Sequence, residues 1–197
     1  MQATNAAGDT RGRTGPDWTA VPLDALPFST MNGLDLSRLA PADAAATLRS
    51  FDRRFRAAVR PVNDPEVDEW AQIPGPDGHS AVDHAAAAGR TLIMLHNALR
   101  QVLTRDDPYL DEAVLDPTAL EWPATTGPVD VELDALGHEA SAMADLVDAT
   151  PGPDWGRAGR APGPTTVDAM QLVREAVGSG VTYLRGAEEA MAAARPD

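Results

Sequence analysis

The chain has 197 residues, of which 43% are hydrophobic but only 5% aromatic, and it carries a formal net charge of −14. This length permits one domain, or one domain with an arm, and an alanine-rich composition with few aromatic residues favours helices. The negative charge argues against binding to nucleic acid, which needs a cationic surface. The chain has neither cysteine nor lysine, which excludes disulfides, thiolate chemistry and Schiff-base lysines.

No apolar run reaches the roughly 18 residues that a membrane-spanning helix requires. Residues 1–8 lack the basic and apolar regions of a signal peptide. We therefore expect a cytoplasmic protein with no membrane partner. The all-arginine composition, rich in alanine, proline and glycine, resembles that of proteins from high-GC actinobacteria.

Residues 1–40 are predicted to form an irregular N-terminal arm, because glycine and proline recur through them. Pro41 suits a first helical turn. Apolar residues at helical spacing from Ala45 to Val59 then predict a helix that ends at Pro61. Residues 61–79 are rich in proline and glycine and are predicted to be a loop.

Ser80 and Asp83 form a capping-box-like start to a second helix, with aspartate in the place of glutamate. An apolar stripe carries this helix to about Thr104. Residues 105–128 make a long connection, and a loop of that length usually crosses a bundle or covers a pocket.

A third helix is predicted from about Val129 to Pro151, where a Pro-Gly-Pro sequence stops it. Thr165 with Asp168 gives the start of a fourth helix, again with a capping-box-like pattern. No strand pattern of useful length is visible. Four amphipathic helices with one long crossover loop predict an all-α four-helix bundle domain over residues 41–195.

Several short motifs follow one another in a recognisable order. The second helix opens with His79-Ser80-Ala81-Val82-Asp83-His84-Ala85-Ala86-Ala87, and Leu103-Thr104-Arg105-Asp106-Asp107-Pro108 ends it. Trp155-Gly156-Arg157-Ala158-Gly159-Arg160 precedes the fourth helix, and Thr166-Val167-Asp168 opens it. Over residues 44–190 this order resembles the DinB-like family, which contains the N-terminal domain of mycothiol-dependent maleylpyruvate isomerase. Its members usually begin the second helix with Trp-Ser-x-x-Asp/Glu-x-x-x-His. The resemblance implies a DinB-like four-helix bundle.

In that family, one histidine of the second helix and a His-x-x-x-His pair of the fourth helix usually hold a divalent metal. The resemblance places Ala87 at the first of these positions and, in the best register, Ala176 and Gly180 at the pair. No histidine follows His138. We therefore expect no metal site and no cofactor, and the family's metal-dependent thiol transfer is not carried over to this chain.

His84 lies on the same side of the second helix as Ala87, within the apolar arc. It is a candidate general acid or base, since the intrinsic pKa of histidine is near neutral. Asp83, Arg174 or Tyr183 is predicted to assist it, with Asp83 as the second catalytic residue. The alternative is a partly buried histidine bonded to a backbone carbonyl. The remaining histidines have other expected roles. His96 is expected to pack at the edge of the apolar stripe, His138 to face solvent, and His79 to stand at the start of the second helix.

The sequence Gly178-Ser179-Gly180 inside the fourth helix has two explanations. Each glycine lowers the stability of the helix by about 1 kcal/mol relative to alanine, so a compensating reason for the small residues is expected. They either let a neighbouring helix approach closely or line a cavity. Arg174 either binds a carboxylate or phosphate or pairs with an acid. The predicted substrate-binding residues of such a cavity are Ala87, Thr91, Arg174, Gly180 and Tyr183.

Three functions remain open at this point. The first is a metal-independent small-molecule enzyme, an isomerase, cyclase or group transferase of specialised metabolism, that uses His84 and Asp83. The second is a non-catalytic small-molecule binding or resistance protein, and the third is a structural partner subunit. The expected partner is a small-molecule ligand, and bundles of this kind often pair, which is compatible with a homodimer.

Overall fold

The computed structural model describes residues 35–62, 64–117, 121–122 and 127–195. The chain divides into two compact units, Met1–Asp35 and Leu36–Asp197, and the second unit is described here. The irregular arm predicted for residues 1–40 lies, up to residue 34, outside the described residues. Directly before the first helix, a turn is closed by a hydrogen bond of 3.0 Å from Leu39 N to Leu36 O.

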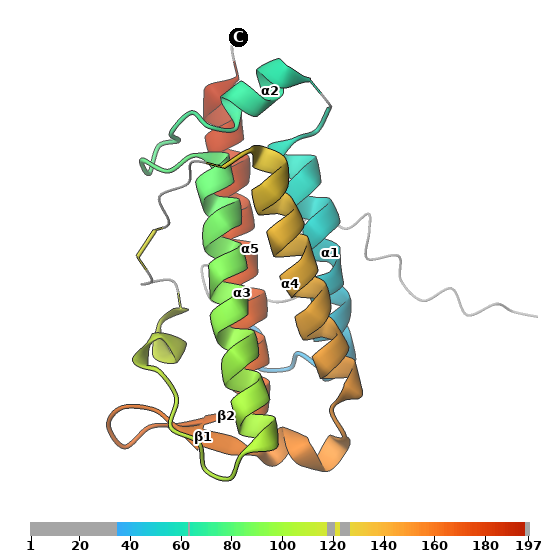
Figure 1. Cartoon of the computed structure of the whole chain (residues 1–197), viewed down its shortest axis with the longest axis vertical. Helices are drawn as coiled ribbons and strands as arrows, with labels where there is room; N and C mark the ends of the chain where they lie inside the picture. The colour runs from blue at the N-terminus through green and yellow to red at the C-terminus, as the bar shows by residue number, and fades with distance from the viewer. Residues whose placement is uncertain (1–34, 63, 118–120, 123–126, 196–197) are drawn as a thin grey trace, which may run out of the picture. The chain divides into compact units, whose positions relative to one another are not determined.

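Four long helices form the bundle, as the sequence predicts: α1 (Pro41–Val59), α3 (Ala81–Thr104), α4 (Val129–Ala149) and α5 (Ala169–Ala194). Each packs against two neighbours in the order α1, α4, α3, α5 and back to α1. Figure 1 shows that α1 and α5 run in one direction while α3 and α4 run in the other, so the long connection between α3 and α4 is a true crossover.

The core is built mainly from alanine, leucine and valine, with few aromatic rings. Phe51 and Phe55 are fully buried on α1 and meet edge to face, with ring centroids 6.2 Å apart. Small side chains let the helices approach closely, and such packing suits the low aromatic content of the sequence. None of the described helices combines the length and apolarity needed to cross a membrane.

The starts of α1 and α3 are those that the sequence predicts. Pro41 occupies the first turn of α1. At α3, the Ser80 hydroxyl accepts a hydrogen bond from Asp83 N (3.2 Å), while Asp83 Oδ2 accepts one from Ser80 N (2.9 Å). This reciprocal capping satisfies two backbone donors that the helix itself leaves without partners.

The predicted start of the fourth helix at Thr165 is wrong. The cap is Asp168, whose Oδ1 accepts from Gln171 N at 2.7 Å. Residues Thr166–Asp168 form β2, which pairs antiparallel with β1 (Ala158–Arg160). The sequence does not indicate these strands, because three residues are too few for an alternating pattern to be visible.

Two segments predicted as loops contain short helices. In residues 61–79, α2 (Pro65–Trp70) begins where Asp64 Oδ1 accepts a hydrogen bond of 3.0 Å from Glu66 N. The proline that suggested a loop is the first residue of this helix, where its missing N–H costs nothing. The crossover contains a 3₁₀ turn, η2 (Glu112–Leu115), and a second one, η4 (Gly152–Gly156), precedes β1.

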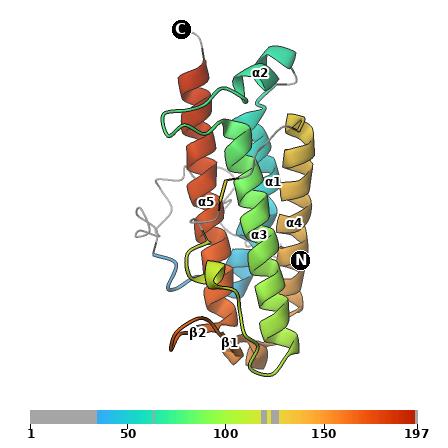
Figure 2. The ribbon, with the colours of Figure 1, turned by 60° about the vertical axis from the view of Figure 1, so that its left-hand side comes forward.

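The beginning of the crossover is fixed to β1. Leu110 N donates to Arg160 O (2.7 Å), and Arg160 N donates to Pro108 O (2.8 Å). From this anchor the chain passes to η2, which lies over the α3–α5 side of the bundle in Figure 2. The crossover therefore covers one particular seam, the one between α3 and α5.

Candidate functional site

Polar side chains gather along the seam between α3 and α5. Residues three, four or seven apart share a helix face, which places His84 and Thr91 together on α3 and Ser179 and Tyr183 together on α5. All four side chains are buried, with between 1% and 5% of their surface exposed. Because the two helices are antiparallel, the start of α3 lies beside the later part of α5.

His84 is the most isolated polar group of this seam. Neither of its ring nitrogens makes a hydrogen bond with any described residue, so the alternative of a histidine bonded to a backbone carbonyl does not hold. Asp77 Oδ2 lies 3.2 Å from His84 Nε2, which is within ion-pair distance. The two atoms are not aligned for a hydrogen bond. Burial lowers the pKa of His84, against the attraction of the Asp77 carboxylate. The neutral imidazole is therefore favoured.

Asp77 reaches His84 because it sits in a tight turn. Gly78 adopts a φ of 87°, which glycine accepts readily. Asp77 Oδ1 accepts a hydrogen bond of 3.0 Å from His79 N, as aspartate commonly does in turns. The other carboxylate oxygen is then turned toward His84. Asp77 is not among the residues predicted for the site, although the Pro-Asp-Gly sequence is a turn signal.

Asp83, predicted both to cap the helix and to assist His84, makes the capping contacts. Its Oδ2 accepts hydrogen bonds from both Ser80 N (2.9 Å) and Ser80 Oγ (2.7 Å). Its charge raises the pKa of His84, but less than that of Asp77 does. The carboxylate placed to assist His84 is therefore that of Asp77.

Gly186 makes room for the imidazole. A Cβ atom at this position of α5 would collide with the ring of His84. No other residue type fits there without a shift of the ring, because any side chain begins with that atom. Gly186 is not among the residues predicted for the site either, since a lone glycine in a helix gives no indication of what faces it.

Trp122, from the crossover, closes this end of the seam. Its indole stacks on His79 with ring centroids 3.6 Å apart and planes 8° apart. It also meets the rings of His84 and Tyr183 edge to face, at 5.0 and 5.7 Å. Trp122 is half-buried and covers the pair formed by His84 and Tyr183, whose ring centroids are 6.4 Å apart.

Tyr183 and Thr91, two of the predicted binding residues, are brought together. Burial raises the pKa of Tyr183, a hydrogen bond with Thr91 opposes this shift, and the charge of Asp116 adds to it. The phenol therefore stays protonated at neutral pH. The Thr91 hydroxyl also donates to Pro117 O at 3.4 Å. Ala87, only 5% exposed, lies one turn after His84 on α3.

The other predicted binding residues point elsewhere. Arg174 Nη2 donates to Ser37 O (3.2 Å), in the segment before α1, instead of reaching into the seam. Gly180 faces α1, because a Cβ atom there would collide with the ring of Phe51. Of the two explanations for the glycines of α5, close helix approach is therefore the one that holds at Gly180, and its predicted place in a cavity wall is wrong.

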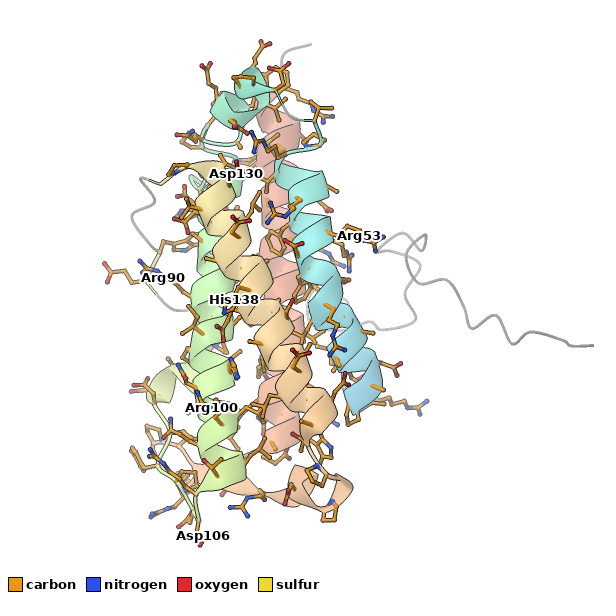
Figure 3. The ribbon with its side chains drawn as sticks, turned by 45° about the vertical axis from the view of Figure 1, so that its right-hand side comes forward. Arg53, Arg90, Arg100, Asp106, Asp130 and His138 are labelled. Atoms are coloured by element: carbon orange, nitrogen blue, oxygen red, sulfur yellow. The ribbon has the colours of Figure 1, made fainter. Side chains whose placement is uncertain are left out.

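The remaining histidines have other surroundings. His96 contacts the Glu139 carboxylate of α4 through Nδ1. His138 is exposed on the outer face of α4, as Figure 3 shows, which confirms its predicted solvation. Neither of these two rings faces the seam. His84 is the histidine that lies in the seam, against α5.

The residues of the seam do not fit a divalent metal. Ala87, Ala176 and Gly180, at the positions where the resemblance expects ligands, have no donor atom in their side chains. Among the described residues, no three side chains of histidine, cysteine, aspartate or glutamate come close enough together to hold an ion. His84 and Asp77 are only two such groups, whereas zinc sites in proteins use at least three protein ligands.

Sequence comparison finds no protein-family model that matches the chain and no similar curated protein. The fold does have a solved counterpart. YfiT from Bacillus subtilis, described as a probable metal-dependent hydrolase with an unusual four-helix bundle topology, superposes with a TM-score of 0.62. The match covers 78% of this chain and 86% of that chain, at 14% sequence identity. At that identity the match establishes the fold alone, a four-helix bundle, which the sequence predicts.

Proposed function

We propose that the chain is a metal-independent enzyme that isomerises a compact carbonyl compound by proton transfer at the α3–α5 seam. The observation that carries the proposal is the pairing of His84 and Tyr183. Their ring centroids lie 6.4 Å apart, and both side chains are buried. Their surroundings move the two pKa values in opposite directions, downward for His84 and upward for Tyr183.

Opposite shifts of this kind separate the roles of base and acid. The neutral imidazole of His84 accepts a proton from a carbon next to the substrate carbonyl. The phenol of Tyr183 donates a hydrogen bond to the carbonyl oxygen, on which negative charge develops. Returning the proton to a different atom of the substrate completes the isomerisation and leaves both groups as they began.

Asp77 would support the charged state of this cycle. Its carboxylate lies 3.2 Å from His84 Nε2, so it stabilises the imidazolium that forms when His84 accepts the proton. Trp122 contacts both reacting groups from the crossover side and would pack against the bound substrate.

The test is exchange of carbon-bound hydrogen with solvent. A panel of small ketones and keto acids is incubated in D₂O with the protein and followed by ¹H NMR, which detects proton abstraction without knowledge of the product. We expect exchange that is lost in His84→Asn, strongly reduced in Tyr183→Phe, and unchanged in the matched control His138→Asn. Exchange that survives in His84→Asn would contradict the proposal.

The alternative, a binding or resistance protein, is distinguished in the same experiment. A panel member that shifts the seam resonances in the wild type and in His84→Asn, with no deuterium incorporated in either, would identify a binding protein. Deuterium incorporation that a chelator abolishes and zinc restores would overturn the metal-independent part of the proposal.

A further inference from the structure

A groove of about 370 Å³ lies on another side of α5, between the later parts of α1 and α5. Its volume is within the size range of small-molecule sites. Its apolar walls are formed by Ala57, Ala58, Met191 and Ala192. None of the seam residues lines it, so its function is independent of the proton transfer proposed above.

Arg54, at this groove, is a half-buried cation that forms no ion pair within the described part of the chain. Three other arginines, two on α1 and one at its C-cap, each bind an aspartate, at 2.7, 2.8 and 2.9 Å: Arg49, Arg56 and Arg60. Arg54 makes no hydrogen bond or ion pair with the described residues, and Glu188 attracts it only through space. Burial lowers its pKa, since the lost hydration is not replaced. A buried charge is costly unless it is paired.

The charges at the groove indicate the kind of ligand. Arg54 and Arg195 are two cations and Glu188 is one anion, so the groove carries a net positive charge in a chain of net charge −14. A guanidinium binds a carboxylate through two parallel hydrogen bonds. The alanine and methionine walls favour an apolar body on the same ligand.

We infer that this groove binds a small monocarboxylate with an apolar body, its carboxylate paired with Arg54 and its body against Met191 and Ala192. Glu188 then competes with the ligand for Arg54. The groove therefore discriminates by charge as well as by shape, and it rejects an amine of the same length.

The test uses octanoate as the probe, with 1-octanol and octylammonium as the uncharged and cationic controls. Each is titrated into the full chain and followed by ¹H–¹⁵N NMR at the amides of Ala57, Ala58 and Ala192. We expect saturable shifts with octanoate and much weaker ones with the controls. Arg54→Gln should weaken octanoate binding by at least about tenfold, while Glu188→Gln should strengthen it.

Two further variants separate binding from folding. Arg53 is the matched control for Arg54, because it is exposed and points away from the bundle (Figure 3), and Arg53→Gln should leave binding unchanged. Ala192→Phe fills the groove from an exposed position and should abolish binding while the thermal transition is retained. Failure of octanoate to saturate below about 10 mM, equal binding of 1-octanol, or unchanged binding in Arg54→Gln would each overturn the inference.

Discussion

Replacing Gly186 with alanine tests the placement of His84 directly. A glycine inside a helix costs about 1 kcal/mol relative to alanine, so the substitution alone would raise the free energy of unfolding by about that amount. Here the new Cβ atom collides with the imidazole of His84, and overpacking of this kind costs about 1–3 kcal/mol. We therefore expect a net destabilisation of up to about 2 kcal/mol, although most helical glycine-to-alanine changes stabilise.

A double-mutant cycle isolates the contact. In a His84→Ala background the collision is absent, so Gly186→Ala should now stabilise the protein by about 1 kcal/mol. The two effects differ by a coupling energy of about 1–3 kcal/mol, well above the error of additivity between distant sites. Urea unfolding followed by circular dichroism on the four proteins provides the free energies.

Gly89 is the matched control for this cycle. It lies in the middle of α3, and a Cβ atom there would have its nearest neighbour at 3.6 Å, the Cα atom of Leu136, which is an ordinary contact. Gly89→Ala should therefore stabilise by about 1 kcal/mol in either background. Equal effects of Gly186→Ala with and without His84 would refute the argument, since the imidazole would then not occupy the space over Gly186.

Three further predictions concern the ends of the seam. Arg157→Ala should lower the free energy of unfolding by about 1–2 kcal/mol, measured by urea unfolding. The reason is that Nε donates to Val102 O in the last turn of α3 (2.9 Å), and Nη2 donates to Arg105 O at the C-cap (2.8 Å). The pKa of His84 is lower in the folded than in the unfolded chain, so the unfolded chain binds a proton first as pH falls through about 6.5, and the folded state should lose stability. This loss should be smaller in His84→Asn. If the melting temperature fell equally with pH in the wild type and in the variant between pH 7.5 and 5.5, the prediction would be contradicted. Asp77→Asn should lower the pKa of His84 further, because the Asp77 carboxylate raises it, and NMR titration of the ring would show no change if that contact were absent.

The sequence predicts the features of this protein that depend on neighbours in the chain. Ser80 and Asp83 are three residues apart, and both hydrogen bonds of their capping box form within one turn. Thr165 and Asp168 show the same spacing, yet the helix begins at the second of them. Pairing of β2 with β1 holds Thr166 in an extended conformation, and that long-range contact overrides the local pattern.

The candidate site was predicted only in part, for a similar reason. His84 is visible in the sequence because a histidine interrupts an apolar face, and face membership is a local property. Asp77 acts on it only because the turn at Gly78 directs one carboxylate oxygen toward α3. Trp122 lies nearly forty residues beyond His84 and reaches it through the crossover. Neither partner follows from helical spacing, since neither belongs to a helix.

The two faces of α5 explain why the small residues of this helix were difficult to interpret. Toward α3 the helix presents Ser179 and Tyr183, both buried, and toward α1 it presents Gly180 beneath Phe51. One short sequence therefore serves both a polar seam and a tight apolar contact. Because the phenylalanine occupies the space over Gly180, widening the seam from the α1 side would displace a fully buried ring at a cost of several kcal/mol. The proposed proton transfer is accordingly confined to the α3 side, where the rings of His84 and Tyr183 have centroids 6.4 Å apart.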